Sequence, residues 1–411
     1  MVTHTSRRAA TAAALALALV LPVVATAGTA SAAQVPPGPA AAPAVPAPGL
    51  SSAVARRSAV APELPRPTGS LPVGSTVLHL VDRSRPDPWV PSAAGRELMV
   101  TLHYPAARSG GDRPAPYATT EEAARLVEGT GLGSAVDPAE LAAMRTYSRS
   151  DVRPAPGRRP LVVLSPGFGL SRYTLTALAE DLASRGYVVA SVDHAYESYG
   201  IATPDGRVLG CVACTEVFEG RADGGKVTAA RAGDVSFLLD RLTGRHPVWK
   251  HAGIIDRKRI GMAGHSIGGA AAATAMLGDA RVRAGVNMDG AFHDKLPAGG
   301  LGGRPFLMLG ADDGHLPGGE DTTWDPAWRT LGSGEKRWLT VAGADHGSFC
   351  DAPVIFGHFG LPGQPPIPVE RAVQLTRTYV AAFFDRHLRG TEQPLLDGPS
   401  PANPEVTFHN P

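Results

Sequence analysis

The sequence predicts an α/β protein with a mostly parallel central sheet and helices on both faces. Two observations lead to this prediction. Several short segments, such as 160–167 and 187–194, are continuous apolar runs, as in strands that are buried on both faces. Between these runs lie segments in which apolar residues recur at helical spacing and end at glycine, as at 174–186. Such alternation of strands and helices is typical of a parallel sheet.

The expected elements follow one another in a regular order along the chain. The first strand, 96–106, alternates like a strand on an exposed sheet edge. A capping box that opens a helix is expected at 119–122, where the sequence reads TTEE. The other expected strands span 160–167, 187–194, 260–264, 282–290, 304–312 and 336–345. The other expected helices span 174–186, 227–244, 268–277 and 369–390.

The chain is expected to divide into four parts. Two arginines, a long apolar stretch and a small-residue cleavage site predict a removed signal peptide over 1–32, and hence a secreted protein. A Pro- and Ala-rich lead-in, without helical or strand periodicity, spans 33–66. One large domain over 67–395 and a C-terminal tail over 396–411 complete the chain.

Composition and cysteine content bear on the kind of partner. The net charge is +1, which gives no basic surface for nucleic acid and no polybasic stripe for a membrane. The three cysteines are Cys211, Cys214 and Cys350. Neither a redox motif nor a zinc site is supported around the first two, so a disulfide is expected, with its pairing left open. No metal or organic cofactor is expected, and the sequence does not predict the oligomeric state.

Ser266 is the first candidate catalytic residue. It lies in the motif GHSIG, after the apolar run that ends at Gly264 and before an alanine-rich helix. This is the context of a nucleophile elbow, a sharp turn between strand and helix that places a serine at the edge of the sheet. The turn requires small residues at 264, 268 and 269, and all three are glycine.

A serine nucleophile needs a base and a carboxylate that orients this base. His346 lies just past the strand at 336–345, which is where the base of this architecture is expected. Two places compete for the acid. Asp289 ends the strand after the elbow helix, whereas Asp312 and Asp313 end the next strand.

An oxyanion hole needs two backbone N–H donors. One is expected from Ile267, directly after the serine. The other is expected from Phe168, in the loop LSPGFG that follows an early strand, because Gly167 and Gly169 allow this backbone to bend toward the site.

Together the segments SPGFGLSRYTLTALAEDLASRGYVVASVDH, GHSIGGAAA, GVNMDGAF and ADHGSF resemble the plasma-type platelet-activating factor acetylhydrolase family of α/β-hydrolases and its bacterial relatives. The resemblance covers about residues 70 to 390. It implies Asp289 as the acid, Phe168 and Ile267 as the oxyanion hole, and calcium-independent hydrolysis of short or oxidised sn-2 acyl groups of phospholipids. It also implies contact with lipid surfaces through apolar rim helices. Such helices would lie within 108–158, although packing on the domain is the simpler expectation for their apolar residues.

Two further interpretations stay open. Secreted actinobacterial cutinases and polyester hydrolases share the elbow and take their acid from about the position of Asp312. A secreted binding protein that keeps the fold without turnover is the alternative from a different class. The segments 193–200 and 314–324 leave strands at their carboxyl ends and are expected to line the cleft. Within them, His194 and Glu197 are expected to be structural hydrogen-bonding residues rather than binding residues.

Overall fold

The computed structural model describes residues 62–107, 113–332 and 334–409 of the chain. The predicted signal peptide, and the predicted lead-in up to residue 61, lie outside these residues. Within the described residues, one ten-stranded sheet forms the centre of the domain, and a two-stranded hairpin accompanies it. The predicted α/β class is confirmed.

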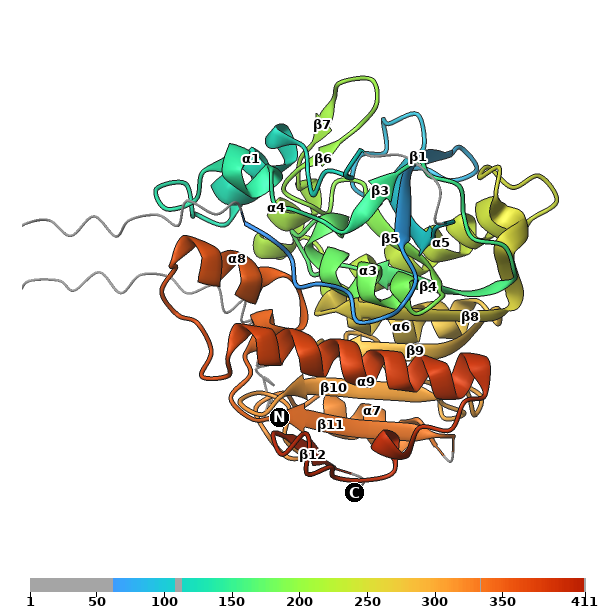
Figure 1. Cartoon of the computed structure of the whole chain (residues 1–411), viewed down its shortest axis with the longest axis vertical. Coiled ribbons are helices and arrows are strands. Elements are labelled where there is room, and N and C mark those ends of the chain that lie inside the picture. Colours follow the sequence, from blue (N-terminus) through green and yellow to red (C-terminus); the bar gives the residue numbers. More distant parts are fainter. Residues whose placement is uncertain (1–61, 108–112, 333, 410–411) are drawn as a thin grey trace, which may run out of the picture. The chain divides into compact units, whose positions relative to one another are not determined.

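The strands of the large sheet lie in the order β12-β11-β10-β9-β8-β4-β5-β2-β1-β3 (Figure 1). The run from β5 through β4, β8, β9 and β10 to β11 is parallel, as predicted. β1 and β2, β2 and β5, and β11 and β12 pair antiparallel. The strands are β1 Val73–Asp82, β2 Arg96–Pro105, β3 Ser148–Ser150, β4 Arg159–Ser165, β5 Val188–His194, β8 Ile255–His265, β9 Val282–Met288, β10 Phe306–Ala311, β11 Lys336–Val341 and β12 Val406–Phe408, with the hairpin β6 Ile201–Ala202 and β7 Val208–Leu209.

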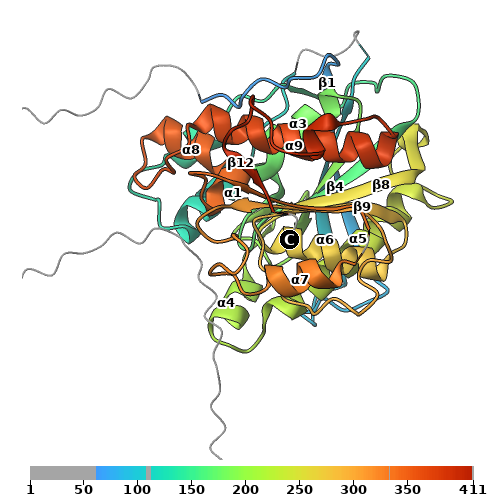
Figure 2. The same ribbon diagram turned by 90° about the horizontal axis from the view of Figure 1, so that it is seen from below.

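Helices cover both faces of the sheet. Seen along the sheet, α3 and α9 lie on one face and α5, α6 and α7 on the other (Figure 2). The helices are α1 Thr120–Gly129, α2 Pro138–Ala142, α3 Thr176–Ser184, α4 Val212–Phe218, α5 Gly224–Thr243, α6 Ile267–Gly278, α7 Trp324–Thr330, α8 Ala352–Phe359 and α9 Val369–Arg389. Short 3₁₀ turns occur at Arg172–Leu175, Ala252–Ile254, His346–Phe349 and Pro394–Leu396.

Each face of the sheet has its own apolar core. Trp324 and Trp338 belong to the core under α5, α6 and α7, whereas Phe383 and Phe384 belong to the core under α9. Burying one such side chain contributes about 1.5–3 kcal/mol. The helices lie close to the strands: a Cβ at Gly261 in β8 would lie 2.5 Å from the Phe384 ring. Rigid packing on both faces therefore fixes the carboxyl ends of β4, β8, β9 and β10, where the candidate site residues lie.

The predicted position of 96–106 at a sheet edge is wrong. This segment forms β2, which lies between β5 and β1. β1 was not expected, and it pairs with β2 along its whole length, from Val73 opposite Pro105 to Asp82 opposite Arg96. β2 is consequently almost fully buried, and its alternating pattern reflected residue types rather than exposure.

The large domain extends beyond both predicted boundaries. Leu64, placed in the lead-in, is buried, and its N–H donates to the carbonyl of Arg145. The predicted C-terminal tail contains β12, which extends the sheet beside β11. Short segments of this kind gain regular structure from a partner that their own sequence does not reveal.

The predicted capping box at 119–122 is confirmed. The Thr119 side chain accepts from the Glu122 N–H, and the Glu122 side chain accepts from the Thr119 N–H. The apolar residues Leu126 and Val127 of α1 are buried in a cluster with Leu141 of α2, as the simpler expectation for this region proposed.

Candidate active site

Ser266 lies between the end of β8 and the start of α6, as predicted. Its backbone has φ 57° and ψ −130°, a combination that costs a non-glycine residue roughly 1–3 kcal/mol. The turn is fixed on both sides, because the Ser266 N–H donates to the Met288 carbonyl at 2.8 Å and the Ser266 carbonyl accepts from Gly269 at 2.8 Å. The strained conformation is thus held by the strand end and the first turn of the helix.

The requirement for glycine at three neighbouring positions is confirmed. A Cβ at Gly264 would lie 2.1 Å from the backbone of Gly268. At Gly268 it would lie 2.1 Å from the Ser165 carbonyl oxygen, and at Gly269 it would lie 2.0 Å from Asn287 Oδ1. These distances leave no room for a larger residue, so the elbow packs directly on the ends of β4 and β9.

Asp289 and His346 are brought together. Asp289 directly follows β9 with φ 61°, and its Oδ2 lies 2.6 Å from His346 Nδ1. Its Oδ1 accepts from the Ala311 N–H at 2.7 Å. Burial raises the pKa of Asp289, but contacts with His315 and His346 outweigh burial and hold this pKa well below its ordinary value. Burial lowers the pKa of His346, whereas Asp289 raises it, and the net pKa lies above the ordinary 6.5.

The two alternative acids lie elsewhere. Asp312 Oδ1 accepts from the Gly343 N–H at 3.1 Å and so closes a turn. Asp313 is exposed in the following loop. Among the described residues, His346 makes its side-chain hydrogen bond to Asp289.

His346 also lies beside the elbow. His265, the residue before Ser266, donates from Nε2 to the His346 carbonyl at 2.7 Å, and the two imidazole rings lie 4.8 Å apart. The imidazole of His346 is 41% exposed, so it can meet a ligand from solvent. The three strand ends of β8, β9 and β11 thus bring Ser266, Asp289 and His346 to one place.

Phe168 and Ile267, the two expected backbone donors, belong to one buried apolar cluster. Ile267 is the first residue of α6, and the first N–H groups of a helix have no partner within the helix. Within residues 62–107, 113–332 and 334–409, no carbonyl or side chain accepts from the Phe168 N–H. The next residue, Gly169, has φ 76° and donates to the Glu197 carbonyl at 3.0 Å. This bend leaves the Phe168 amide free.

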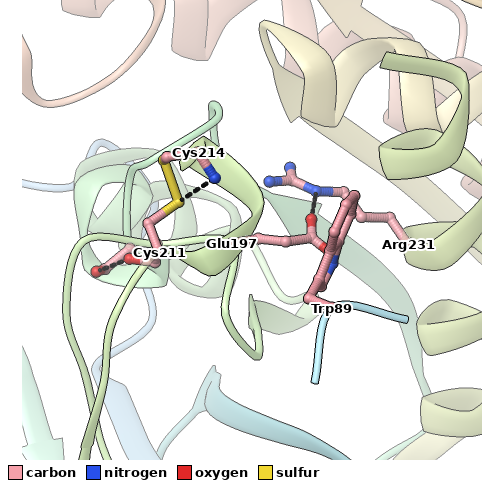
Figure 3. The surroundings of a disulfide bond; sticks show 7 residues. Trp89, Glu197, Cys211, Cys214 and Arg231 are labelled. Atoms are coloured by element: carbon pink, nitrogen blue, oxygen red, sulfur yellow. Dashed lines mark hydrogen bonds and ion pairs between the residues drawn. A yellow bond between two sulfur atoms is a disulfide. The ribbon is translucent and has the colours of Figure 1, made fainter. Parts of the chain in front are cut away.

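A buried ionic network supports the loop that contains Phe168. Arg231 donates to the Pro166 carbonyl, to Ser165 Oγ at 3.2 Å and to Glu197 Oε2 at 2.8 Å. Trp89 donates from its indole N–H to Glu197 at 2.9 Å (Figure 3). Every one of these side chains is buried.

Arg96 is the centre of this network. It is fully buried and forms ion pairs with Asp87 at 3.0 Å, with Asp234 at 2.8 Å and with Glu197 at 2.5 Å. His194 completes the network through a 2.7 Å contact from Nδ1 to Asp234. His194 and Glu197 therefore make structural contacts, as expected, and the arginines of the network were not identified from the sequence.

A disulfide joins Cys211 and Cys214 at the start of α4, and Cys350 is a buried free thiol. The expectation of a disulfide is confirmed, and the pairing that the sequence left open is settled. Figure 3 shows this bond beside Trp89, Glu197 and Arg231.

At the other end of α4, Phe218 is 55% exposed and its ring lies edge-on to Phe168 at 6.2 Å. The exposed Phe218 ring thus packs against the buried ring of Phe168.

His315 is a site residue that the sequence analysis missed. It lies in the 314–324 segment that was expected at the cleft, and its Nδ1 lies 3.0 Å from Asp289 Oδ1.

Within the part of the chain that the structure describes, no group of three or more His, Cys, Asp or Glu residues could hold a metal ion. None of the helices described is long and apolar enough to cross a membrane.

Comparison with known proteins places this site in a class. A family model described as platelet-activating factor acetylhydrolase, isoform II, matches residues 132–204, which include the Phe168 loop. A solved structure, a ferulic acid esterase from Streptomyces cinnamoneus, is similar to the chain with a TM-score of 0.75 and 48% identity, covering 85% of this chain and 100% of that one. The chain is thus a carboxylic ester hydrolase with the α/β-hydrolase fold.

Sequence relatives define the family. A probable 1-alkyl-2-acetylglycerophosphocholine esterase of Arthroderma benhamiae is 30% identical over 387 residues, which cover 84% of this chain and 93% of that protein. The platelet-activating factor acetylhydrolase of Canis lupus familiaris is 25% identical over 267 residues, covering 56% of this chain and 57% of that protein. The chain belongs to the platelet-activating factor acetylhydrolase family, as the resemblance of its motifs indicated.

Proposed function

We propose that Ser266, His346 and Asp289 act as the catalytic triad of a secreted serine esterase. The observation that carries this proposal is the 2.6 Å contact between Asp289 and His346, beside a serine in a strained turn. Asp289 fixes Nδ1 of His346 as the protonated nitrogen, which leaves Nε2 free to act as a base. His346 takes the proton of Ser266 while Oγ attacks the ester carbonyl.

The tetrahedral intermediate then receives hydrogen bonds from the amides of Phe168 and Ile267. His346, now protonated, gives its proton to the departing alcohol, and an acyl-serine remains. Water attacks this acyl group with the same base, and the cycle releases the acid and restores the serine hydroxyl. Each step uses only groups that lie at the ends of β4, β8, β9 and β11.

The substrate that we propose is an ester of a hydroxycinnamic acid, of the kind that the name of the Streptomyces relative implies. The supporting observation is the exposed Phe218 on the Phe168 ring, because aromatic rings in offset or edge-on contact contribute about 0.5–1.5 kcal/mol beyond their burial. The 48% identity of that relative also exceeds the 30% identity of the Arthroderma protein.

A phospholipid with a short sn-2 acyl group is the second candidate. The names of the Arthroderma and dog relatives favour it. Leu316 in the loop after β10 and Phe218 on α4 are both large, exposed apolar residues, and they could contact a lipid surface.

The test is the specificity constant of the purified chain on methyl ferulate, on a 2-acetyl phosphatidylcholine and on a solid polyester. Ser266→Ala serves as the blank, and we expect it to lower kcat by at least 10⁴-fold. A preference for methyl ferulate supports the first substrate, and a preference for the acetyl phospholipid supports the second. A preference for the polyester would support the cutinase-like interpretation. Turnover that survives in Ser266→Ala would contradict the proposed triad, and no turnover in either protein would favour a binding function.

Export is part of the same proposal. The disulfide between Cys211 and Cys214 supports it, because disulfides persist in oxidising compartments outside the cytosol. N-terminal sequencing of protein recovered from the culture medium of an expressing bacterium should begin at residue 33. Protein retained in the cell with its first 32 residues intact would contradict export.

A further inference from the structure

We propose that His315 is a positioning residue: it fixes the carboxylate of Asp289 and places a second positive charge on the side opposite His346. This inference rests on the proposed triad. His315 acts on His346 through Asp289 and through its own charge.

The backbone of His315 is held firmly at the end of β10. Its N–H donates to the Ala311 carbonyl at 3.1 Å, and its carbonyl accepts from the Trp338 indole N–H at 2.8 Å. The imidazole ring lies 4.1 Å from the Trp324 ring, which is fully buried. The backbone contacts and the Trp324 ring therefore restrict the position of the imidazole.

In this position the imidazole lies between two carboxylates. Nδ1 lies 3.0 Å from Asp289 Oδ1, and Nε2 lies 3.2 Å from Asp321 Oδ2. These contacts are close ion pairs rather than well-aligned hydrogen bonds. Asp321 is itself fixed, because its Oδ1 accepts from the Thr323 N–H at 2.7 Å and from the Thr323 hydroxyl at 2.6 Å.

This arrangement makes His315 a cation at neutral pH. Burial lowers the pKa of His315, but Asp289 and Asp321 outweigh burial and raise it to about 9. Asp289 therefore contacts two imidazoles, of which one is permanently protonated in the working range and the other must exchange its proton. The charge of His315 lowers the pKa of His346 and so opposes the effect of Asp289 on the same ring.

Other charged groups near His346 do not replace this role. His265 stays neutral, because burial and the neighbouring His346 lower its pKa to about 3. Asp345, which precedes His346, raises the pKa of the His346 ring. Asp313 carries a pKa raised by burial and by the carboxylates around it. Of the groups that act on the His346 ring, His315 is the cation that offsets the carboxylates.

The sign of the effect follows directly. Replacing His315 with a neutral residue removes a positive charge near His346, so the pKa of His346 rises. The base must be neutral to act, and activity falls as the pH drops through this pKa. The acid limb of the pH profile must therefore move to higher pH.

The experiment is the pH dependence of kcat/KM for His315→Gln. We expect the acid limb to move upward by about one pH unit, the size expected for removing one nearby charge. At a pH below both limbs this corresponds to a loss of about tenfold, and at a pH above both limbs the loss should be smaller. A loss of equal size at every pH, with the limb unmoved, would overturn the proposal and leave His315 with a purely structural role.

His387→Gln is the matched control. His387 in α9 lies 3.3 Å from Glu335, and its side chain is 10% exposed, as is that of His315. Burial lowers the pKa of His387 to about 4, so its imidazole is neutral at the pH of the test. Glu335 precedes β11, so this pair lies at the opposite edge of the sheet from the candidate site. The pH profile of His387→Gln should match that of the unsubstituted chain, and a shift there of the same size would overturn the assignment to His315.

A second measurement leaves His315 in place. In Ser266→Ala, the proton NMR signal of the His315 ring, assigned by its contact with Trp324, should titrate above pH 8. A titration below pH 7 would overturn the proposal. If Ser266→Ala keeps its activity, the proposed triad fails instead, so the two failures are distinguishable.

Discussion

The two sides of Ser266 stabilise buried carboxylates in different ways. On the acid side, Asp289 is held by the imidazoles of His346 and His315 and by one backbone amide. On the oxyanion side, Glu197 is held by the guanidinium groups of Arg96 and Arg231. Both carboxylates are buried, and both have a pKa below the ordinary value.

The difference lies in whether the partner can release a proton. A guanidinium group is charged at every pH at which the protein is folded, so the oxyanion loop keeps one geometry. An imidazole can lose its proton near neutral pH, so the acid side can take part in proton transfer. The oxyanion side is thus held by permanent charges, whereas the acid side combines a lasting cation, His315, with an imidazole, His346, that exchanges its proton.

The strongest test of this contrast is Asp289→Asn. An asparagine has no negative charge, so it neither keeps the proton of His346 on Nδ1 nor stabilises the protonated ring. We therefore expect kcat to fall by about 10³–10⁴-fold. Asp312→Asn is the control and should stay within about threefold, because Asp312 bonds the Gly343 amide instead. Equal losses in the two variants, measured with the same ester, would contradict the assignment of Asp289.

On the oxyanion side, a substitution should mainly lower the stability of the fold. Arg96→Met removes the cation shared by three buried carboxylates, so we expect the free energy of unfolding to fall by about 3–5 kcal/mol. Urea denaturation followed by circular dichroism measures this loss. Arg207→Met removes an exposed arginine that also pairs with carboxylates, and it should cost less than about 1 kcal/mol. A similar cost for both would show that burial of the network contributes nothing.

The pH dependence of kcat/KM of the unsubstituted chain tests whether the acid side raises the pKa of His346. Because the pKa of His346 lies above 6.5, the acid limb of kcat/KM should have its midpoint above pH 6.5. Activity should fall about tenfold per pH unit below this midpoint, since protonated His346 cannot act as a base. Circular dichroism over the same range should stay constant. A midpoint below 6.5 would mean that Asp289 does not raise the pKa of this histidine.

The smallest expected effect concerns the aromatic surface beside the oxyanion loop. Phe218→Ala should lower kcat/KM for methyl ferulate by about fivefold and leave an acetyl ester of the same alcohol unchanged, because an aromatic contact contributes about 1 kcal/mol. Val77→Ala, in β1, is the control, since Val77 is similarly exposed at 52%. Equal losses for both esters would show that Phe218 does not contact the acyl group.

Much of the fold could be predicted because its information is local. A few neighbouring residues are enough to recognise the apolar runs of β4, β5 and β9 and the glycines of the elbow. β1, β3 and β12 could not be predicted in this way, because each forms only where a neighbouring strand offers an edge.

The site shows the same division. Ser266 could be identified from the elbow motif and His346 from its place after β11, because their spacing is typical of the fold. His315 lacked such a signal: its role depends on Asp321 and Asp289, which reach it from loops 6 and 26 residues away in the sequence. Arg96 was equally hidden, since an arginine at the start of a strand is usually exposed, and only the assembled network shows it buried among three carboxylates.

The strained backbone of Ser266 has a consequence for engineering. A glycine at this position would adopt φ 57° and ψ −130° freely, so Ser266→Gly should fold into a more stable protein that has no nucleophile. A selection for heat resistance alone would therefore favour loss of the reactive residue. Directed evolution of this chain has to select for turnover and thermal tolerance together, because at residue 266 the two properties oppose each other.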